Sequence, residues 1–245
     1  MKLTGNTILI TGGSSGIGLE LARRFLALKN KVIITGRDRE KLQSLQDQFP
    51  ELDIFTGDLA NEQALNELIL FITKKHANLN ILVNNAAVQY NYRFTDAADL
   101  SPKINYEIAV NLTAPVKLTG LLLPLLQQQE NSAVVNVSSA LFIAPKQTAS
   151  VYCATKAALH SFTKTLRYQL ENTNVRVFEI IPALIDTPMT AGRKQSKMPP
   201  EKLVDEFLHH FKKNTYEIYI GKTKLLKLIN RLSPALAQRI LKNAS

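Results

Sequence analysis

A tyrosine and a lysine with helical spacing are the first candidates for chemistry in this chain of 245 residues. Residues 152–156 read YCATK and open a stretch of helical periodicity, so we expect Tyr152 and Lys156 to lie one turn apart on one face. A free phenol titrates at pH ~10 and is a poor acid–base catalyst at neutrality, but a nearby ammonium favours its ionised form. Because such pairs are common on helices, this pair indicates either an acid–base group or ordinary helix surface.

Two hydroxyl side chains follow a buried-strand pattern shortly before this pair. Ser138 and Ser139 end the apolar run that begins at Ala133. In open α/β sheets, ligands bind at the carboxyl ends of the strands, where a serine hydroxyl could hold a carbonyl oxygen beside Tyr152. Serines after strands also form turns, so the two interpretations stay open here.

The glycine-rich stretch from Thr11 to Gly18, TGGSSGIG, predicts a phosphate-binding turn between a strand and a helix. Glycine lets the backbone approach a phosphate, and the helix N-terminus offers free N–H groups and a positive dipole end. The spacing differs from Gly-x-Gly-x-x-Gly, and no Lys-Ser/Thr follows as in a nucleoside-triphosphate loop. A tight connection without a ligand is the alternative. The residues expected at a dinucleotide are Gly12, Ser14, Ser15, Gly16, Ile17 and Gly18.

The residues after the second predicted strand indicate which dinucleotide would bind. A carboxylate there would accept from the ribose 2′-hydroxyl of NAD(H), whereas an arginine accommodates a 2′-phosphate. The chain has Arg37 at this point, followed by Asp38, which we expect to cap a helix. Arg37 therefore favours NADP(H) over NAD(H), unless it is only a helix-flanking residue.

The elements that must position these residues alternate along the chain. Continuous apolar runs typical of strands buried on both faces alternate with helical patterns. The predicted strands are Thr7–Thr11, Lys31–Thr35, Asp53–Thr56, Ile81–Asn84, Ala133–Ser138, Arg176–Ile181 and Glu217–Ile220. The predicted helices are Gly16–Lys29, Asp38–Gln48, Asn61–His76, Tyr106–Gln129, Tyr152–Glu171 and one from Glu201. We predict an α/β fold: one domain over residues 1–245, with a doubly wound (Rossmann) parallel sheet of about seven strands and helices on both faces.

The motifs together resemble the short-chain dehydrogenase/reductase family of single-domain type. They occur in that family's order: Thr11–Gly18, Asp58-Leu59, NNAA at 84–87, Asn111, Ser138-Ser139, Tyr152 with Lys156, and the stretch from Pro182. The resemblance implies an oxidoreductase that transfers a hydride between NADP(H) and a carbonyl or secondary alcohol. Alanines stand at 87 and 183, where family members often have glycine, which puts fine geometry in doubt but not the reaction class.

The resemblance also implies a role for individual residues. Tyr152 would be the general acid/base, and Lys156 would lower its pKa and bind the nicotinamide ribose. Ser139 would be the catalytic serine, and Asn111 would hold a water that links Lys156 to solvent. Thr187 would bind the nicotinamide carboxamide, and Asp58 the adenine. The other residues expected at the cofactor are Leu59, Asn84, Ala86, Pro182 and Ile185. A catalytically weak NADP(H)-binding sensor with the same fold is the alternative function.

Apolar residues are expected around the substrate, in and before a substrate-loop region at residues 187–215. They are Val88, Tyr90, Leu141, Phe142, Ile185 and Met189, and they favour a hydrophobic carbonyl compound or alcohol. No His, Cys and carboxylate cluster has metal-ligand spacing, so we expect no metal site. His209 and His210 are expected to be surface or packing residues.

The net charge of +10 is spread along the chain without an aromatic-interleaved basic tract, so we expect no nucleic-acid partner. The single cysteine and the absence of a signal-peptide pattern are compatible with the cytoplasm. Residues 222–245 form a basic amphipathic segment, with Leu225, Leu228, Ile229 and Leu232 on one face. We expect this face to dock on the domain or on a second subunit rather than on an anionic membrane. The segment is similar to that of the bacterial DltE-like members of the family. Separately, the resemblance to the family implies a homodimer or homotetramer, because its members usually pair through the fourth and fifth helices.

Overall fold

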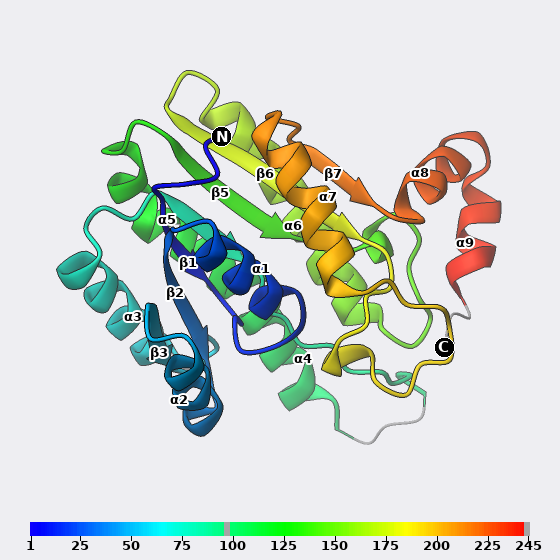
Figure 1. Cartoon of the computed structure of the whole chain (residues 1–245). Helices are drawn as coiled ribbons and strands as arrows, with labels where there is room; N and C mark the ends of the chain where they lie inside the picture. The colour runs from blue at the N-terminus through cyan, green and yellow to red at the C-terminus, as the bar shows by residue number, and fades with distance from the viewer. Residues whose placement is uncertain (96–98, 243–245) are drawn as a thin grey trace.

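Seven strands form one parallel sheet in the computed structural model, which describes residues 1–95 and 99–242 (Figure 1). The strands are β1 Thr7–Ile10, β2 Lys31–Gly36, β3 Leu52–Thr56, β4 Ile81–Asn84, β5 Ser132–Val137, β6 Val175–Pro182 and β7 Glu217–Ile220. Their order is β3-β2-β1-β4-β5-β6-β7, so the direction of winding reverses between β1 and β4. A doubly wound sheet binds its ligand at this reversal, at the carboxyl ends of the strands. The predicted fold class is confirmed.

Helices cover both faces of the sheet (Figure 1). They are α1 Gly16–Ala27, α2 Arg39–Gln48, α3 Glu62–Lys75, α4 Ser101–Ile108, α5 Ala114–Gln127, α6 Ser150–Gln169, α7 Pro200–Lys212, α8 Thr223–Leu232 and α9 Pro234–Lys242. One core layer includes Phe25 of α1 and Phe207 of α7, and the other includes Leu68 of α3 and Leu118 of α5. Because each strand is packed on both sides, its apolar residues run continuously, as the sequence predicts.

The helix predicted over Tyr106–Gln129 begins earlier and is not regular. It starts with α4 at Ser101 and passes through a π-helical turn, Ala109–Thr113, into α5. Within the described residues, the segment Ser101–Gln127 is long and apolar enough to cross a membrane by length and composition. However, Leu118, Leu122 and Leu126 are fully buried against the sheet, which accounts for the apolar composition.

The helix predicted from Glu201 is confirmed as α7, which begins at Pro200. Helix α7 occupies residues 200–212 of the predicted substrate-loop region, which leaves a loop between Thr187 and Pro199. Helices α8 and α9 pack against each other at one edge of the molecule (Figure 1).

Within this chain, the basic C-terminal segment packs on the domain mainly through residues outside the predicted face, and docking of that face on a second subunit stays a prediction. Leu226 and Ala237 are buried with Ala144, and Ile229 packs against them. Leu225, Leu228 and Leu232, three of the residues predicted to dock, are exposed. The physical reason is that the helix carries apolar residues on adjacent faces, and only one face meets the segment after β5.

Candidate active site

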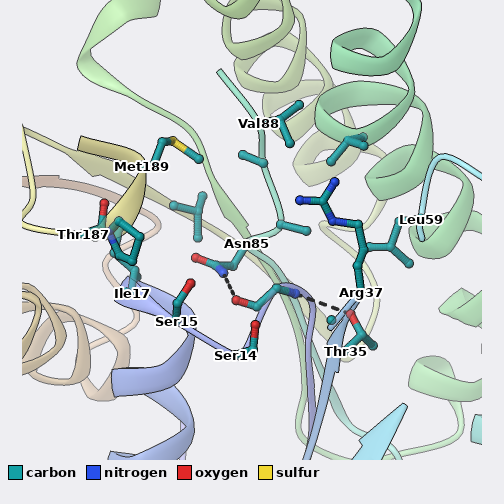
Figure 2. Close-up of a pocket in the computed structure, with 18 of the residues that line it drawn as sticks. Ser14, Ser15, Ile17, Thr35, Arg37, Leu59, Asn85, Val88, Thr187 and Met189 are labelled. Atoms are coloured by element: carbon teal, nitrogen blue, oxygen red, sulfur yellow. Dashed lines mark hydrogen bonds between the residues drawn. The ribbon is translucent and has the colours of Figure 1, made fainter. Parts of the chain in front are cut away.

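A cleft at the carboxyl ends of the strands brings together most of the predicted site residues (Figure 2). Arg37 and Leu59 lie on one side, and Thr187 and Met189 lie on the other. The predicted residues in its lining are Gly12, Ser14, Ser15, Gly16, Ile17, Arg37, Asp58, Leu59, Ala86, Val88, Tyr152, Lys156, Pro182, Thr187 and Met189. Residues predicted at the cofactor, at the acid–base pair and at the substrate therefore line the same cleft.

The glycine turn brings the N-terminus of α1 to the cleft. Gly12 and Gly16 have φ values of +64° and +54°, a region that favours glycine, and a Cβ on Gly12 would lie 2.9 Å from the Cα of Ala86. The Asn85 amide fastens the turn by donating to the carbonyl oxygens of Thr11 and Gly12 at 2.9 and 3.1 Å. Ser15, at the N-cap of α1, makes no side-chain capping bond. The first N–H groups of α1 can therefore donate to an anion.

Arg37 lies where β2 ends and is held by a tyrosine that sequence analysis missed. Its guanidinium donates to the phenol oxygen of Tyr106, and that phenol donates to Asp58 Oδ2 at 2.8 Å. Burial and the bond to Asp58 raise the pKa of Tyr106, so the phenol stays neutral. Asp38 caps α2 by accepting from the backbone N–H of Lys41, as predicted.

Tyr152 and Lys156 lie in the first turns of α6, and both are buried at the floor of the cleft. The Lys156 ammonium donates to the carbonyl oxygen of Val137 at 2.8 Å and lies 5.6 Å from the centroid of the Tyr152 ring. A hydrogen bond with Ser139 lowers the pKa of Tyr152. Ser138 lines the cleft but its hydroxyl donates to the Ile180 carbonyl, whereas Ser139, which lies outside the lining, is the serine that bonds the phenol.

Burial dominates the ionisation of both groups. It raises the pKa of Tyr152 to about 12, against the lowering effects of the Ser139 bond and the Arg193 guanidinium. It lowers the pKa of Lys156 to about 8, while the Glu179 carboxylate opposes this shift. The pKa of Tyr152 is raised because burial outweighs the opposing effects, and the Lys156 ammonium donates to the Val137 carbonyl rather than to the phenol. Tyr152 therefore keeps its proton at physiological pH.

Asn111 lies in the π-helical turn and is buried beside the cleft rather than in its lining. Its Oδ1 accepts from the N–H of Val88, and its Nδ2 donates to the carbonyl oxygen of the same residue, both at 2.8 Å. Nδ2 also donates to Thr155 Oγ1 on α6. Asn111 therefore ties Val88, which lines the cleft, to the helix that carries Tyr152 and Lys156.

Several predicted site residues lie away from the cleft lining. The Asn84 amide is buried and donates to Thr119 and Asn136, so the cofactor-facing asparagine is Asn85. Ile185 is packed in the core. Gly18 is required by close packing, since a Cβ there would lie 2.4 Å from the carbonyl oxygen of Gly12.

Only some of the predicted substrate residues lie at the cleft. Val88 and Met189 line the cleft, and Leu141 packs against Tyr152. Phe142 instead stacks on His160 of α6, with ring centroids 4.0 Å apart. Because this stacking uses the ring face, Phe142 belongs to the support of α6.

Four residues at or near the site were missed by sequence analysis: Asn85, Tyr106, Glu179 and Arg193. Asn85 lies inside the NNAA motif, so the motif itself could have identified it. Tyr106 and Arg193 have no local signal, because long-range packing brings them to the site. Glu179 lies inside a strand, and a charged residue in an apolar run is the signal that could have found it.

Residues 6–198 match the short chain dehydrogenase family. The chain belongs to this family. This short-chain dehydrogenase is 41% identical over 224 residues to the oxidoreductase DltE of Bacillus subtilis, covering 89% of each chain. It is 28% identical over 212 residues to an oxidoreductase of Staphylococcus aureus strain MW2, covering 84% of this chain and 91% of that one. As a family member, it is an oxidoreductase that acts on alcohol and carbonyl groups, and a DltE-like subgroup is consistent with the first match.

Solved structures of other short-chain dehydrogenases share the fold. One from Burkholderia cenocepacia, in complex with NADP, superposes with a TM-score of 0.87 at 24% identity, covering 99% of this chain and 100% of that one. One from Sphingobium yanoikuyae, in complex with NADPH, superposes with a TM-score of 0.83 at 24% identity, covering 95% of each chain.

Proposed function

We propose that this short-chain dehydrogenase catalyses NADP(H)-dependent hydride transfer to a carbonyl carbon, or from a secondary alcohol, with Tyr152 exchanging the proton. The observation that carries the proposal is the buried Tyr152–Lys156 pair at the floor of a cleft that begins at the N-terminus of α1. Bound NADP(H) would supply or accept the hydride. The protein supplies the proton, the orientation and the exclusion of water.

The residues of the cleft fit a phosphorylated dinucleotide. The uncapped N–H groups of α1 would donate to its pyrophosphate, and the glycine turn leaves room for it. Arg37 would pair with the 2′-phosphate, Asp58 would contact the adenine, and Thr187 would bind the carboxamide. The Burkholderia and Sphingobium enzymes, which bind NADP and NADPH, support this choice of cofactor.

Each residue of the acid–base group has a distinct role in the proposal. Tyr152 donates its proton to the oxygen of the carbonyl substrate, and Ser139 holds the same oxygen by a hydrogen bond. Lys156 binds the nicotinamide ribose and stabilises the phenolate that remains after proton transfer. Asn111 would hold the water that links Lys156 to solvent.

A fluorescence titration with NADPH and with NADH tests the cofactor, and Tyr152→Phe tests the chemistry. We expect the wild type to prefer NADPH and to reduce ketones, and Tyr152→Phe to bind NADPH but lose about 10²–10⁴-fold in kcat. Tyr152→Phe with wild-type turnover would contradict the acid–base role. A wild type that binds NADPH without reducing any ketone would favour the sensor function instead.

We further propose a cytoplasmic homodimer or homotetramer. Ile108 and Leu121 of the α4–α5 segment are exposed apolar residues, which supports burial of this face against another copy. Light scattering of the purified protein should give two or four times the mass of 27.3 kDa. A monomer at micromolar concentration would contradict this assembly.

A further inference from the structure

A second recess opens beside the active-site cleft, and its lining is strongly basic. Met189 lines both the cleft and the recess. The cationic side chains of the recess are Arg93, Lys146, Arg193 and Lys194. Among the described residues that line it, none is an aspartate or a glutamate. A recess of this composition attracts anions.

Lys146 is unusual because its side chain is buried without a carboxylate partner. The residue is 8% exposed, and its backbone N–H donates to the Cys153 sulfur at the start of α6. Within residues 1–95 and 99–242, no ion pair joins it to an aspartate or a glutamate. Burial and the Arg193 charge both lower the pKa of Lys146. Lysine is seldom buried unless a partner compensates for the lost water.

Arg193 is close enough to both Lys146 and the catalytic tyrosine for its charge to act on each. Its guanidinium lowers the pKa of Tyr152, and its positive charge also lowers the pKa of Lys146. One nitrogen donates to the Gln89 side-chain oxygen at 2.8 Å. A guanidinium has five N–H donors in a planar fork, so this bond orients Arg193 and leaves donors for a ligand.

Glu107, whose carboxyl group acts on the pKa values of Tyr152 and Cys153, does not neutralise these cations. It is fully buried, and its Oε1 accepts from the backbone N–H of Tyr90. Burial raises its pKa, which favours the uncharged acid. Lys146 and Arg193 thus repel each other without a compensating carboxylate among the described residues. A bound anion would stabilise both positive charges.

We propose that Arg193 and Lys146 bind the carboxylate or phosphate group of an anionic carbonyl substrate whose reacting carbon lies at Tyr152. The proposal rests on the proposed function and adds the substrate class. The phosphates of the cofactor are not the expected anion, because Arg37 lies across the cleft from Met189 (Figure 2) and no residue of the glycine turn lines the recess. The apolar residues Val88 and Leu141 would contact the carbon skeleton. The proposed substrate is therefore a hydrophobic carbonyl compound, as predicted from the sequence, that also carries an anionic group.

The test compares acids with their neutral counterparts. The probes are 4-oxopentanoate and its methyl ester, and hydroxyacetone phosphate and hydroxyacetone, each reduced with NADPH. Because Arg193 also acts on Tyr152, the measured quantity is the ratio of kcat/KM for the anion to that for its neutral counterpart, within each variant. We expect a ratio well above one for the wild type. The pair of probes with the larger ratio shows whether the site binds a carboxylate or a phosphate. Arg193→Gln and Lys146→Gln should each lower that ratio about 10- to 100-fold, as for a lost charge-assisted hydrogen bond.

Lys202→Gln is the matched control, since Lys202 is exposed on α7, lies outside both linings and loses the same charge. It should keep the wild-type ratio. Calorimetric titration of the NADPH-saturated protein with 4-oxopentanoate and with inorganic phosphate adds a readout that needs no turnover. Thermal unfolding identifies any variant that fails to fold, in which case Arg193→Lys replaces Arg193→Gln and should lower the ratio less.

The outcomes separate the two proposals. Reduction of neutral ketones without an anion preference, or with a preference that survives both variants, overturns the anion site and leaves the proposed function standing. Binding of either anion that requires Arg193, in a protein that reduces none of the probes, supports the anion site and overturns the proposed function. No binding of either anion by the wild type overturns the anion site.

Discussion

The guanidinium of Arg37 donates a hydrogen bond to the phenol oxygen of Tyr106, and its carbon lies 5.8 Å from the centroid of that ring. Tyr106 comes from α4, and it also donates to Asp58 after β3. Three separate segments therefore fix the guanidinium at one end of the cleft. An arginine that is oriented before binding loses less freedom when it pairs with a phosphate.

This arrangement predicts that Arg37 and Tyr106 both contribute to cofactor choice. Arg37→Ala should raise the Kd for NADPH about 10- to 100-fold, because a charge-assisted bond to the 2′-phosphate is lost. Tyr106→Phe keeps the ring but releases Arg37, and a smaller rise of about 3- to 10-fold is expected. Neither change should alter the Kd for NADH more than about twofold. Fluorescence titration measures all four values, and an equal effect on both cofactors would contradict the assignment of Arg37.

The pH dependence of reduction should follow Lys156. With a pKa of about 8, Lys156 is positively charged below that pH and loses its charge above it, whereas Tyr152, with a pKa of about 12, keeps its proton throughout. The rate of ketone reduction should therefore be level below pH 8 and fall above it, as the phenolate loses its cation. In Lys156→Met the rate should be low and this fall absent. An unchanged fall in Lys156→Met would assign it to another group.

Glu179 gives an independent test of the same ionisation. Its buried carboxylate raises the pKa of Lys156 and is held by the His160 ring nitrogen at 2.9 Å. Glu179→Gln removes the negative charge, so the pKa of Lys156 falls and the loss of rate should move to lower pH. Glu217→Gln is the control, because Glu217 is the neighbour of Glu179 in register on β7 but does not act on Lys156. A shift toward higher pH in Glu179→Gln would contradict the electrostatic role.

Sequence and structure agree where a local pattern is sufficient. The strands follow from continuous apolar runs, and the glycine turn and the Tyr152–Lys156 spacing are each set by residues close in the chain. They disagree where the orientation of a single side chain decides whether it faces the cleft. Asn84 ends β4 and faces the buried side chains of Thr119 and Asn136, so its neighbour Asn85 faces the turn. A motif locates such a pair but does not decide which member faces the ligand.

The residues that could not be predicted are brought in by distant contacts. Arg193 is placed by Gln89, more than one hundred positions earlier, and Tyr106 by Arg37 and Asp58. For the same reason the basic recess is invisible in the sequence, where Lys146 and Arg193 are separated by forty-seven positions (193 minus 146).

Two glycines with opposite surroundings test the packing of the glycine turn. A Cβ on Gly18 would lie 2.4 Å from the Gly12 carbonyl oxygen and 2.5 Å from Asn85 Nδ2, whereas a Cβ on Gly120, inside α5, meets nothing within 4 Å. Gly18→Ala should destabilise the protein by about 1–3 kcal/mol through overpacking and weaken NADPH binding. Gly120→Ala should stabilise it by about 0.5–1 kcal/mol, because alanine loses less conformational freedom in a helix, and should leave binding unchanged. Urea unfolding with and without NADPH measures both effects. If both variants lost similar stability, the close approach of α1 to the turn would not be what requires glycine at position 18.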